Sequence, residues 1–137
     1  MRVGQTRMVI PDTILRRISS FDAADLGPHA TALYREFARV ASAGLPLATI
    51  ILAASIVDVV RYEEAGPAGY LDGGAFSYAG NKANLAWLRG RRNHLVHHEG
   101  PSDGLMGEVD AGRWLVIDAE RAITTLLDFL DGLQLSG

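Results

Sequence analysis

The chain has 137 residues, no cysteine and a formal net charge of −3. This length suits one domain with a real hydrophobic core, and the lack of cysteine excludes disulfides, cysteine-ligated zinc and thiol catalysis. The acidic balance disfavours a protein that coats nucleic acid with a broad basic surface, but it leaves room for a small basic patch.

The first half of the chain predicts three helices. Asp12 is placed to cap a short helix over residues 13–18. Apolar residues recur at helical spacing over residues 28–43. A helix over residues 46–64 is apolar on most of its circumference, so it must be covered by the rest of the domain or by a second subunit. Its polar exceptions form a narrow line on one face: Ser55, Asp58 and Tyr62.

The second half predicts a loop, a helix and a small hairpin. Residues 65–79 are rich in glycine and show no helical period, which is typical of a loop. Residues 81–98 predict a helix that ends before a Gly-Pro pair. Residues 105–117 predict a β-hairpin, with its turn at 110–112 and its second strand at 113–117.

The last predicted element is a helix. Asp118 is placed to cap it, and its apolar stripe reaches Leu133. The expected fold is therefore all-α, a bundle of four to five helices with a minor β-hairpin between the last two. We expect a single domain over residues 1–137, with an N-terminal extension at 1–26 and the core bundle at 28–133.

No segment predicts export or insertion into a membrane. After Arg2 and Arg7 only a short apolar run precedes Pro11, too short for a signal-peptide core. The longest apolar stretch, residues 45–60, is shorter than the ~20 residues that span a bilayer, and it contains Asp58. We therefore expect a soluble, cytoplasmic protein.

The most chemically concentrated segment is Arg-Arg-Asn-His-Leu-Val-His-His at positions 91–98. It contains the spacing Arg92-Asn93-x-x-x-His97 inside a predicted helix. Asn93 and His97 are four residues apart and therefore share one side of that helix. A permanent cation, an amide and a titratable imidazole within two turns can hold a phosphate and move a proton.

Arg92 belongs to the apolar stripe of its helix rather than to the solvated face. Leu85, Leu88, Arg92 and Leu95 are three, four and three residues apart. A guanidinium in such a stripe needs a partner or a wet cleft, because burying it alone is costly. Asp58, a polar exception in the apolar helix 46–64, is a candidate partner.

This motif, on a late helix of a small all-helical domain, resembles that of the HEPN superfamily (higher eukaryote and prokaryote nucleotide-binding domains). The family signature is an arginine, a polar residue, and a histidine four to six positions after the arginine. The resemblance covers residues 28–133 in layout but only the short motif in sequence. It implies a metal-independent endoribonuclease of a toxin–antitoxin or defence-type system, without cofactor. It further implies an active site where two such helices meet in a homodimer, with RNA and an antitoxin or defence protein as partners.

Carried over to this chain, the resemblance makes Arg92 the phosphate-binding residue, Asn93 the polar residue and His97 the catalytic histidine. Arg91 with His97, or Arg92 with His98, also fits the family spacing. We prefer Arg92 with His97, because Asn93 then occupies the polar position and Arg92 the inward stripe.

The chemistry of metal-free RNA cleavage suits these residue types. It needs a base for the ribose 2′-hydroxyl proton, an acid for the leaving oxygen and a cation for the charged phosphorane. Histidine serves as base or acid near neutral pH, and arginine binds phosphate oxygens while staying charged. One subunit supplies one such histidine, so a two-fold dimer with two His97 and two Arg92 would complete the acid–base pair.

Two chemical alternatives compete with this interpretation. Cations are common at helix C-termini because they complement the helix dipole, and the histidines would then have no further role. His94 with His97 or His98 also has metal-ligand spacing, which Asp103 or Asp110 would complete. No Glu-x-x-His or His-Glu-x-x-His motif accompanies them, so we expect no metal site.

A non-enzymatic function is the other hypothesis. A dimeric HEPN-like interaction module, or a module that binds nucleotide or RNA, would keep Arg92 for structure, and fold alone does not determine function. Trp87 and Trp114 are interpreted as packing residues rather than as base-stacking platforms.

Overall fold

The computed structural model describes residues 8–23, 26–69, 82–97 and 111–136. These residues form five α-helices and no strand, which confirms the all-α expectation. The helices are α1 (Asp12–Ser20), α2 (Pro28–Ser42), α3 (Pro46–Gly69), α4 (Lys82–His97) and α5 (Ala111–Ser136). None of these helices is long and apolar enough to cross a bilayer.

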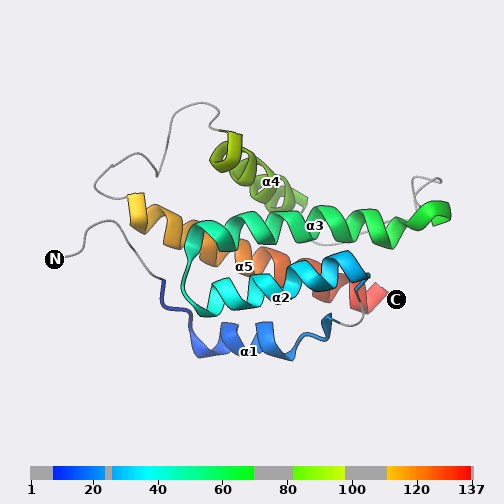
Figure 1. The fold of residues 1–137 in the computed structure, drawn as a ribbon, viewed down its shortest axis with the longest axis horizontal. Coiled ribbons are helices and arrows are strands. Elements are labelled where there is room, and N and C mark those ends of the chain that lie inside the picture. Colours follow the sequence, from blue (N-terminus) through cyan, green and yellow to red (C-terminus); the bar gives the residue numbers. More distant parts are fainter. Residues whose placement is uncertain (1–7, 24–25, 70–81, 98–110, 137) are drawn as a thin grey trace.

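Helix α3 is the centre of the bundle (Figure 1). It packs against α2, α4 and α5, whereas α1 packs against α2 and α5. Helices α1 and α4 therefore lie on opposite sides of the α2–α3–α5 core (Figure 1). Helix α4, which carries the motif, occupies one edge of the bundle.

The neighbours of α3 explain why its sequence is apolar nearly all round. Its buried apolar residues do not lie on a single stripe, because other helices cover it from several directions. They are Ile50, Ala53, Ala54, Ile56, Val57 and Val60. Helices of the same chain thus cover most of the described part of α3, where Leu47 stays 40% exposed.

A tight turn connects α2 to α3 and also anchors the N-terminal segment. Gly44 has a positive φ of 76°, a conformation that favours glycine. Its amide donates to the carbonyl of Ala41 at 3.0 Å, and its carbonyl accepts from the amide of Met8 at 3.1 Å. Met8, Ile10 and Ile18 are buried, so the segment treated above as an N-terminal extension contributes to the core.

Helix α1 begins at Asp12, one residue earlier than predicted. Asp12 is the first residue of the helix, Pro11 occupies the capping position, and no side chain caps this end. The carbonyl of Pro11 accepts hydrogen bonds from the amides of Ile14 and Leu15 instead. The prediction that Asp12 caps the helix is therefore wrong, although its charge still suits the first turn.

The expected second strand of the hairpin is also wrong, because residues 113–117 are helical and belong to α5. An alternating strand would place Leu115 and Ile117 on one face, with Trp114 and Val116 on the other. Instead Leu115 and Val116 pack on the core, while Trp114 and Ile117 are about half exposed. This is helical periodicity, continuous with the buried stripe further along α5.

Two other boundaries differ from the sequence prediction. Asp118, the expected cap, lies well inside α5. Helix α3 continues to Gly69, so residues 65–69 are helical rather than part of a loop. The remainder of that predicted loop, and residues 105–110 of the predicted hairpin, lie outside the described residues.

Candidate functional site

Helix α4 is held to the bundle by a narrow apolar stripe. Leu88 is buried, and Leu85 and Leu95 pack partly against the core, as their spacing predicted. Arg92 stands in the same stripe with its side chain only 18% exposed. The motif arginine is therefore an enclosed cation at the seam between α4 and α3.

Two acceptors hold the Arg92 guanidinium. Its Nη2 donates to Asp58 Oδ2 at 3.1 Å, and its Nε donates to Asn93 Oδ1 at 2.9 Å. The hypothesis that Asp58 pairs with Arg92 is confirmed. Such a pair compensates the cost of removing the guanidinium from water, and removal of Asp58 leaves a poorly solvated cation.

The preceding arginine turns to the other side of α4. Arg91 Nε donates to Asp118 Oδ2 of α5 at 2.7 Å, and the two side chains are 10% and 20% exposed. Consecutive residues on a helix point about 100° apart, so Arg92 reaches α3 while Arg91 reaches α5. The two ion pairs together fix α4 against both of its neighbours.

His94 and His97 lie in the last turn and a half of α4. His94 is partly buried and makes interactions of its own. His97 is the final residue of α4, so its backbone lies about 6 Å along the helix axis from Asn93. The His97 side chain and the whole of His98 lie outside the described part of the chain. Arg92 and Asn93 are thus in contact, while the third motif residue follows one turn later.

Sequence reasoning missed a second polar contact between α4 and α5. The Arg121 guanidinium stacks over the Trp87 ring at 4.0 Å and donates to Asn84 Oδ1 at 3.0 Å. No pattern in the sequence pointed to this contact, because its partners lie 34 and 37 residues apart. Trp87 is thereby covered by a cation, whereas Trp114 is 50% exposed.

A metal site does not emerge from the residues that the structure describes. Among them, no group of three or more His, Asp or Glu side chains is placed to hold an ion. Asp103, Asp110 and His98, which the metal alternative required, lie outside those residues.

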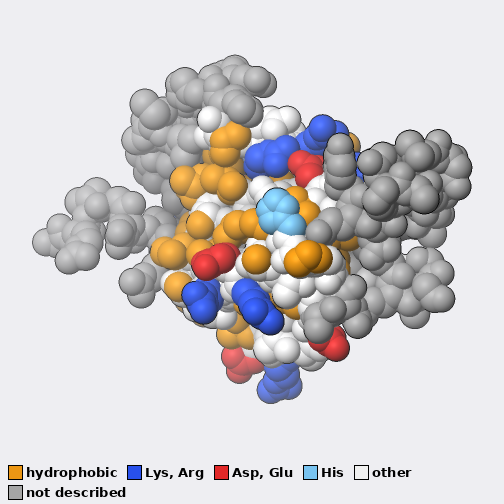
Figure 2. Space-filling model, turned by 45° about the vertical axis from the view of Figure 1, so that its right-hand side comes forward, with side chains coloured by type: hydrophobic (Ala, Val, Ile, Leu, Met, Phe, Trp, Pro, Cys, Tyr) orange, Lys and Arg blue, Asp and Glu red, His pale blue; other side chains and the backbone are white. Residues whose placement is uncertain are grey.

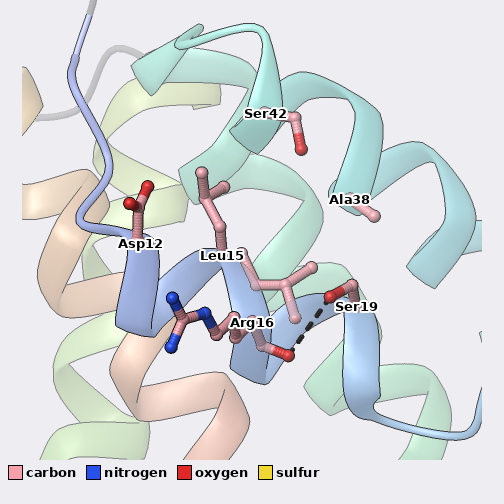
Figure 3. Close-up of a pocket in the computed structure, with 7 residues that line it drawn as sticks. Asp12, Leu15, Arg16, Ser19, Ala38 and Ser42 are labelled. Atoms are coloured by element: carbon pink, nitrogen blue, oxygen red, sulfur yellow. Dashed lines mark hydrogen bonds between the residues drawn. The ribbon is translucent and has the colours of Figure 1, made fainter.

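A hollow of about 450 Å³ lies between α1 and α2, on the side of the bundle away from α4 (Figure 3). Its lining offers few polar groups for a ligand. Ser19 donates to the carbonyl of Arg16 within its own helix, and the Arg16 side chain is exposed. The hollow brings none of the motif residues together. Its lining consists of Asp12, Leu15, Arg16, Ile18, Ser19, Ala38 and Ser42.

The molecular surface agrees with the acidic composition. On the face drawn in Figure 2, the described Lys and Arg side chains stand in small separate groups among apolar and acidic ones. A protein that binds nucleic acid mainly through charge presents a continuous basic surface instead. Any nucleic-acid contact on this face would therefore be local.

Comparison of the chain with protein-family models, with curated proteins and with solved structures yields no significant match. The chemistry and placement of the residues of α4 and of their partners are therefore the evidence on function.

Proposed function

We propose that the chain is a HEPN-like, metal-independent endoribonuclease in which Arg92 binds the scissile phosphate, Asn93 is the polar motif residue and His97 transfers protons. One observation carries the proposal. The motif arginine is an enclosed cation, held at 3.1 Å by Asp58 and at 2.9 Å by Asn93, five residues before His97 on the same helix. A guanidinium so held stays charged and keeps further N–H donors for a phosphate oxygen.

The reaction assigned to these groups is an intramolecular transesterification of the RNA backbone. The ribose 2′-oxygen attacks phosphorus while a neutral His97 takes its proton. The bond from phosphorus to the 5′-oxygen breaks, and that oxygen receives a proton from a second, protonated histidine. The products are a 2′,3′-cyclic phosphate and a 5′-hydroxyl. Arg92 stabilises the extra negative charge of the phosphorane.

A homodimer supplies the second histidine in this proposal. Each chain contributes one His97 and one Arg92, and a two-fold axis near the end of α4 brings both sets into one cleft. Activity within a toxin–antitoxin or defence-type system completes the proposal, and its only support is the motif resemblance. Because the formal net charge of −3 disfavours tight binding of RNA through charge alone, a partner protein is the expected source of RNA specificity.

The second candidate is a non-enzymatic dimeric module for interaction or for nucleotide or RNA binding. The Asp58–Arg92 pair favours it, because a carboxylate at 3.1 Å neutralises the cation and gives it a structural use. The two candidates differ in one outcome, which is whether RNA is cleaved.

The test is incubation of purified protein with structured RNA in EDTA. We expect cleavage that survives chelation and leaves a cyclic phosphate end. His97→Ala should abolish cleavage with little loss of stability, and His94→Ala is the matched control on the same helix, with a much smaller effect.

Three results would count against the proposal. Activity that requires an added divalent ion supports the histidine–metal alternative. Inactivation by His94→Ala or His98→Ala, but not by His97→Ala, means that the motif register is wrong. No cleavage by any form of the protein supports the non-enzymatic module.

A further inference from the structure

The two contacts of Arg92 use only one side of its guanidinium. In arginine the Nε–H and Nη2 lie on the same side of the group, and Nη1 lies on the other. Asn93 accepts from Nε and Asp58 accepts from Nη2, so both acceptors engage that first side. Nη1 makes no hydrogen bond with the residues that the structure describes, and it therefore keeps its two N–H donors.

Asp58 is unusual in its own helix. It is the ionised residue in an apolar part of α3, between Val57 and Val59, and its side chain is 36% exposed. The carboxylate thus reaches the wet edge of the seam, whereas the guanidinium that it holds is enclosed. A carboxylate in this place costs less to desolvate than a buried one and still fixes its partner.

We infer that Asp58 is a positioning residue. It holds Arg92 by the Nε/Nη2 side, so that Nη1 presents its donors to a phosphate oxygen of RNA while the ion pair stays intact. This inference rests on the proposed function for its substrate. The phosphate in the ground state carries one negative charge, and the Asp58 charge offsets part of its attraction to Arg92. The phosphorane carries more negative charge than the phosphate. A well-ordered Nη1 therefore stabilises the transition state more than the ground state.

The chain offers a matched control for this role. Asp118 holds Arg91 through one hydrogen bond at 2.7 Å, and this pair fixes α4 to α5 as the Asp58 pair fixes α4 to α3. Loss of either aspartate removes one anchor of α4 and one carboxylate that an arginine of α4 contacts. Only loss of Asp58 disturbs the orientation of Arg92.

The first experiment measures kcat and KM for RNA cleavage by the wild type, Asp58→Ala, Asp58→Asn and Asp118→Ala. Asp58→Ala should lower kcat on the order of 10- to 100-fold, the effect expected from a misplaced catalytic group. Asp58→Asn keeps an acceptor oxygen and removes the charge, so it should restore most of kcat and lower KM. Asp118→Ala should leave kcat close to wild type.

Three outcomes overturn the inference. Equal losses of kcat in Asp58→Ala and Asp118→Ala mean that the aspartate merely anchors α4. Faster cleavage by Asp58→Ala means that the carboxylate competes with phosphate. An Asp58→Asn variant as inactive as Asp58→Ala means that charge, and not a hydrogen-bond acceptor, is required.

A second experiment separates this inference from the nuclease proposal. The ¹⁵N-edited NMR signal of the Arg92 Nε–H, assigned with Arg92→Lys, reports the order of the guanidinium without any turnover. The signal should be sharp and protected from exchange in the wild type and Asp118→Ala, and broadened in Asp58→Ala. Addition of inorganic phosphate should shift the wild-type signal while it stays sharp. An unchanged signal in Asp58→Ala overturns the positioning role, whereas absent cleavage with the expected spectra overturns only the nuclease proposal.

Discussion

At the scale of single residues, polar side chains inside the bundle are consistently matched with partners. Within the part of the chain that the structure describes, no buried side-chain nitrogen or oxygen lacks a hydrogen bond. Thr49, fully buried in α3, donates to the carbonyl of Leu45 at 2.7 Å, and the Tyr34 hydroxyl donates to the carbonyl of Ile18 at 2.8 Å. These hydrogen bonds matter because a buried polar group without a partner lowers the stability of the fold by more than one formed hydrogen bond raises it.

Tyr34→Phe should destabilise the protein by about 1–2 kcal/mol, because the carbonyl of Ile18 loses its buried donor. Burial, and secondly the charge of Asp131, raise the pKa of the Tyr34 hydroxyl above its usual 10.0, while Arg17 opposes the shift. A raised folded-state pKa means that the protonated form stabilises the fold. This contribution is complete below about pH 10, the unfolded value, and is lost as the pH rises further.

Urea unfolding at pH 7 and near pH 11 measures both parts of this prediction. The wild type should lose more stability than Tyr34→Phe between the two pH values, since the variant has no hydroxyl to ionise at this position. Equal alkaline losses in both proteins would show that Tyr34 is not responsible.

At the scale of the elements, α5 shows how burial decides between helix and strand. Its first turns contain the run Arg-Trp-Leu-Val-Ile, whose residue types favour strands. The helix forms nonetheless, because Leu115 and Val116 then join Ala119 and Ala122 on the side that packs against the core. Tertiary packing therefore overrides a weak local preference.

Ile117→Pro tests the helical state of this segment. Ile117 is 49% exposed, so removing its side chain should cost little, and Ile117→Ala should change stability by no more than about 0.5 kcal/mol. Proline at this position removes a helical hydrogen bond and clashes with the preceding turn, which costs about 3 kcal/mol. Circular dichroism and urea unfolding measure the effect. Equal stability of the proline and alanine variants would contradict a continuous α5.

At the scale of the whole molecule, the position of α4 governs what the motif can do. The helix packs on α3 and α5, and its remaining surface near the C-terminal end carries Val96, which is 44% exposed beside His97. Since helices of the same chain cover most of the described part of α3, its composition by itself does not require a second subunit. The reason to expect a dimer is therefore chemical, namely the need for a second histidine.

Val96→Glu should weaken the proposed dimer and RNA cleavage together, because it places a charge beside the proposed two-fold axis. Val9→Glu is the matched control, since Val9 is 86% exposed and lies just before α1, which packs against α2 and α5. Light scattering across micromolar concentrations should give twice the 14.7 kDa chain mass for the wild type and the control. A wild type that is monomeric throughout this range would remove the basis for a composite site.

Much of the helical order was encoded locally and could be predicted. The stripe of α2, with Ala30, Tyr34, Phe37 and Ala41 three and four residues apart, is buried as its spacing indicated. The inward place of Arg92 followed from the helical period of α4. These features depend on neighbours within about one helical turn, so a single sequence contains them.

The partners of the motif depended on tertiary structure. Asp58 was a candidate partner of Arg92 because a carboxylate in an apolar helix is costly to bury without a cation. The packing of α4 on α3 brings the two side chains together. The Arg91–Asp118 pair had no such signal, because Asp118 resembled a helix cap until residues 111–117 proved helical. Helical period follows from short-range geometry along one chain segment. Which charges meet depends on the angle and register at which helices pack, and that is settled only when the whole core closes.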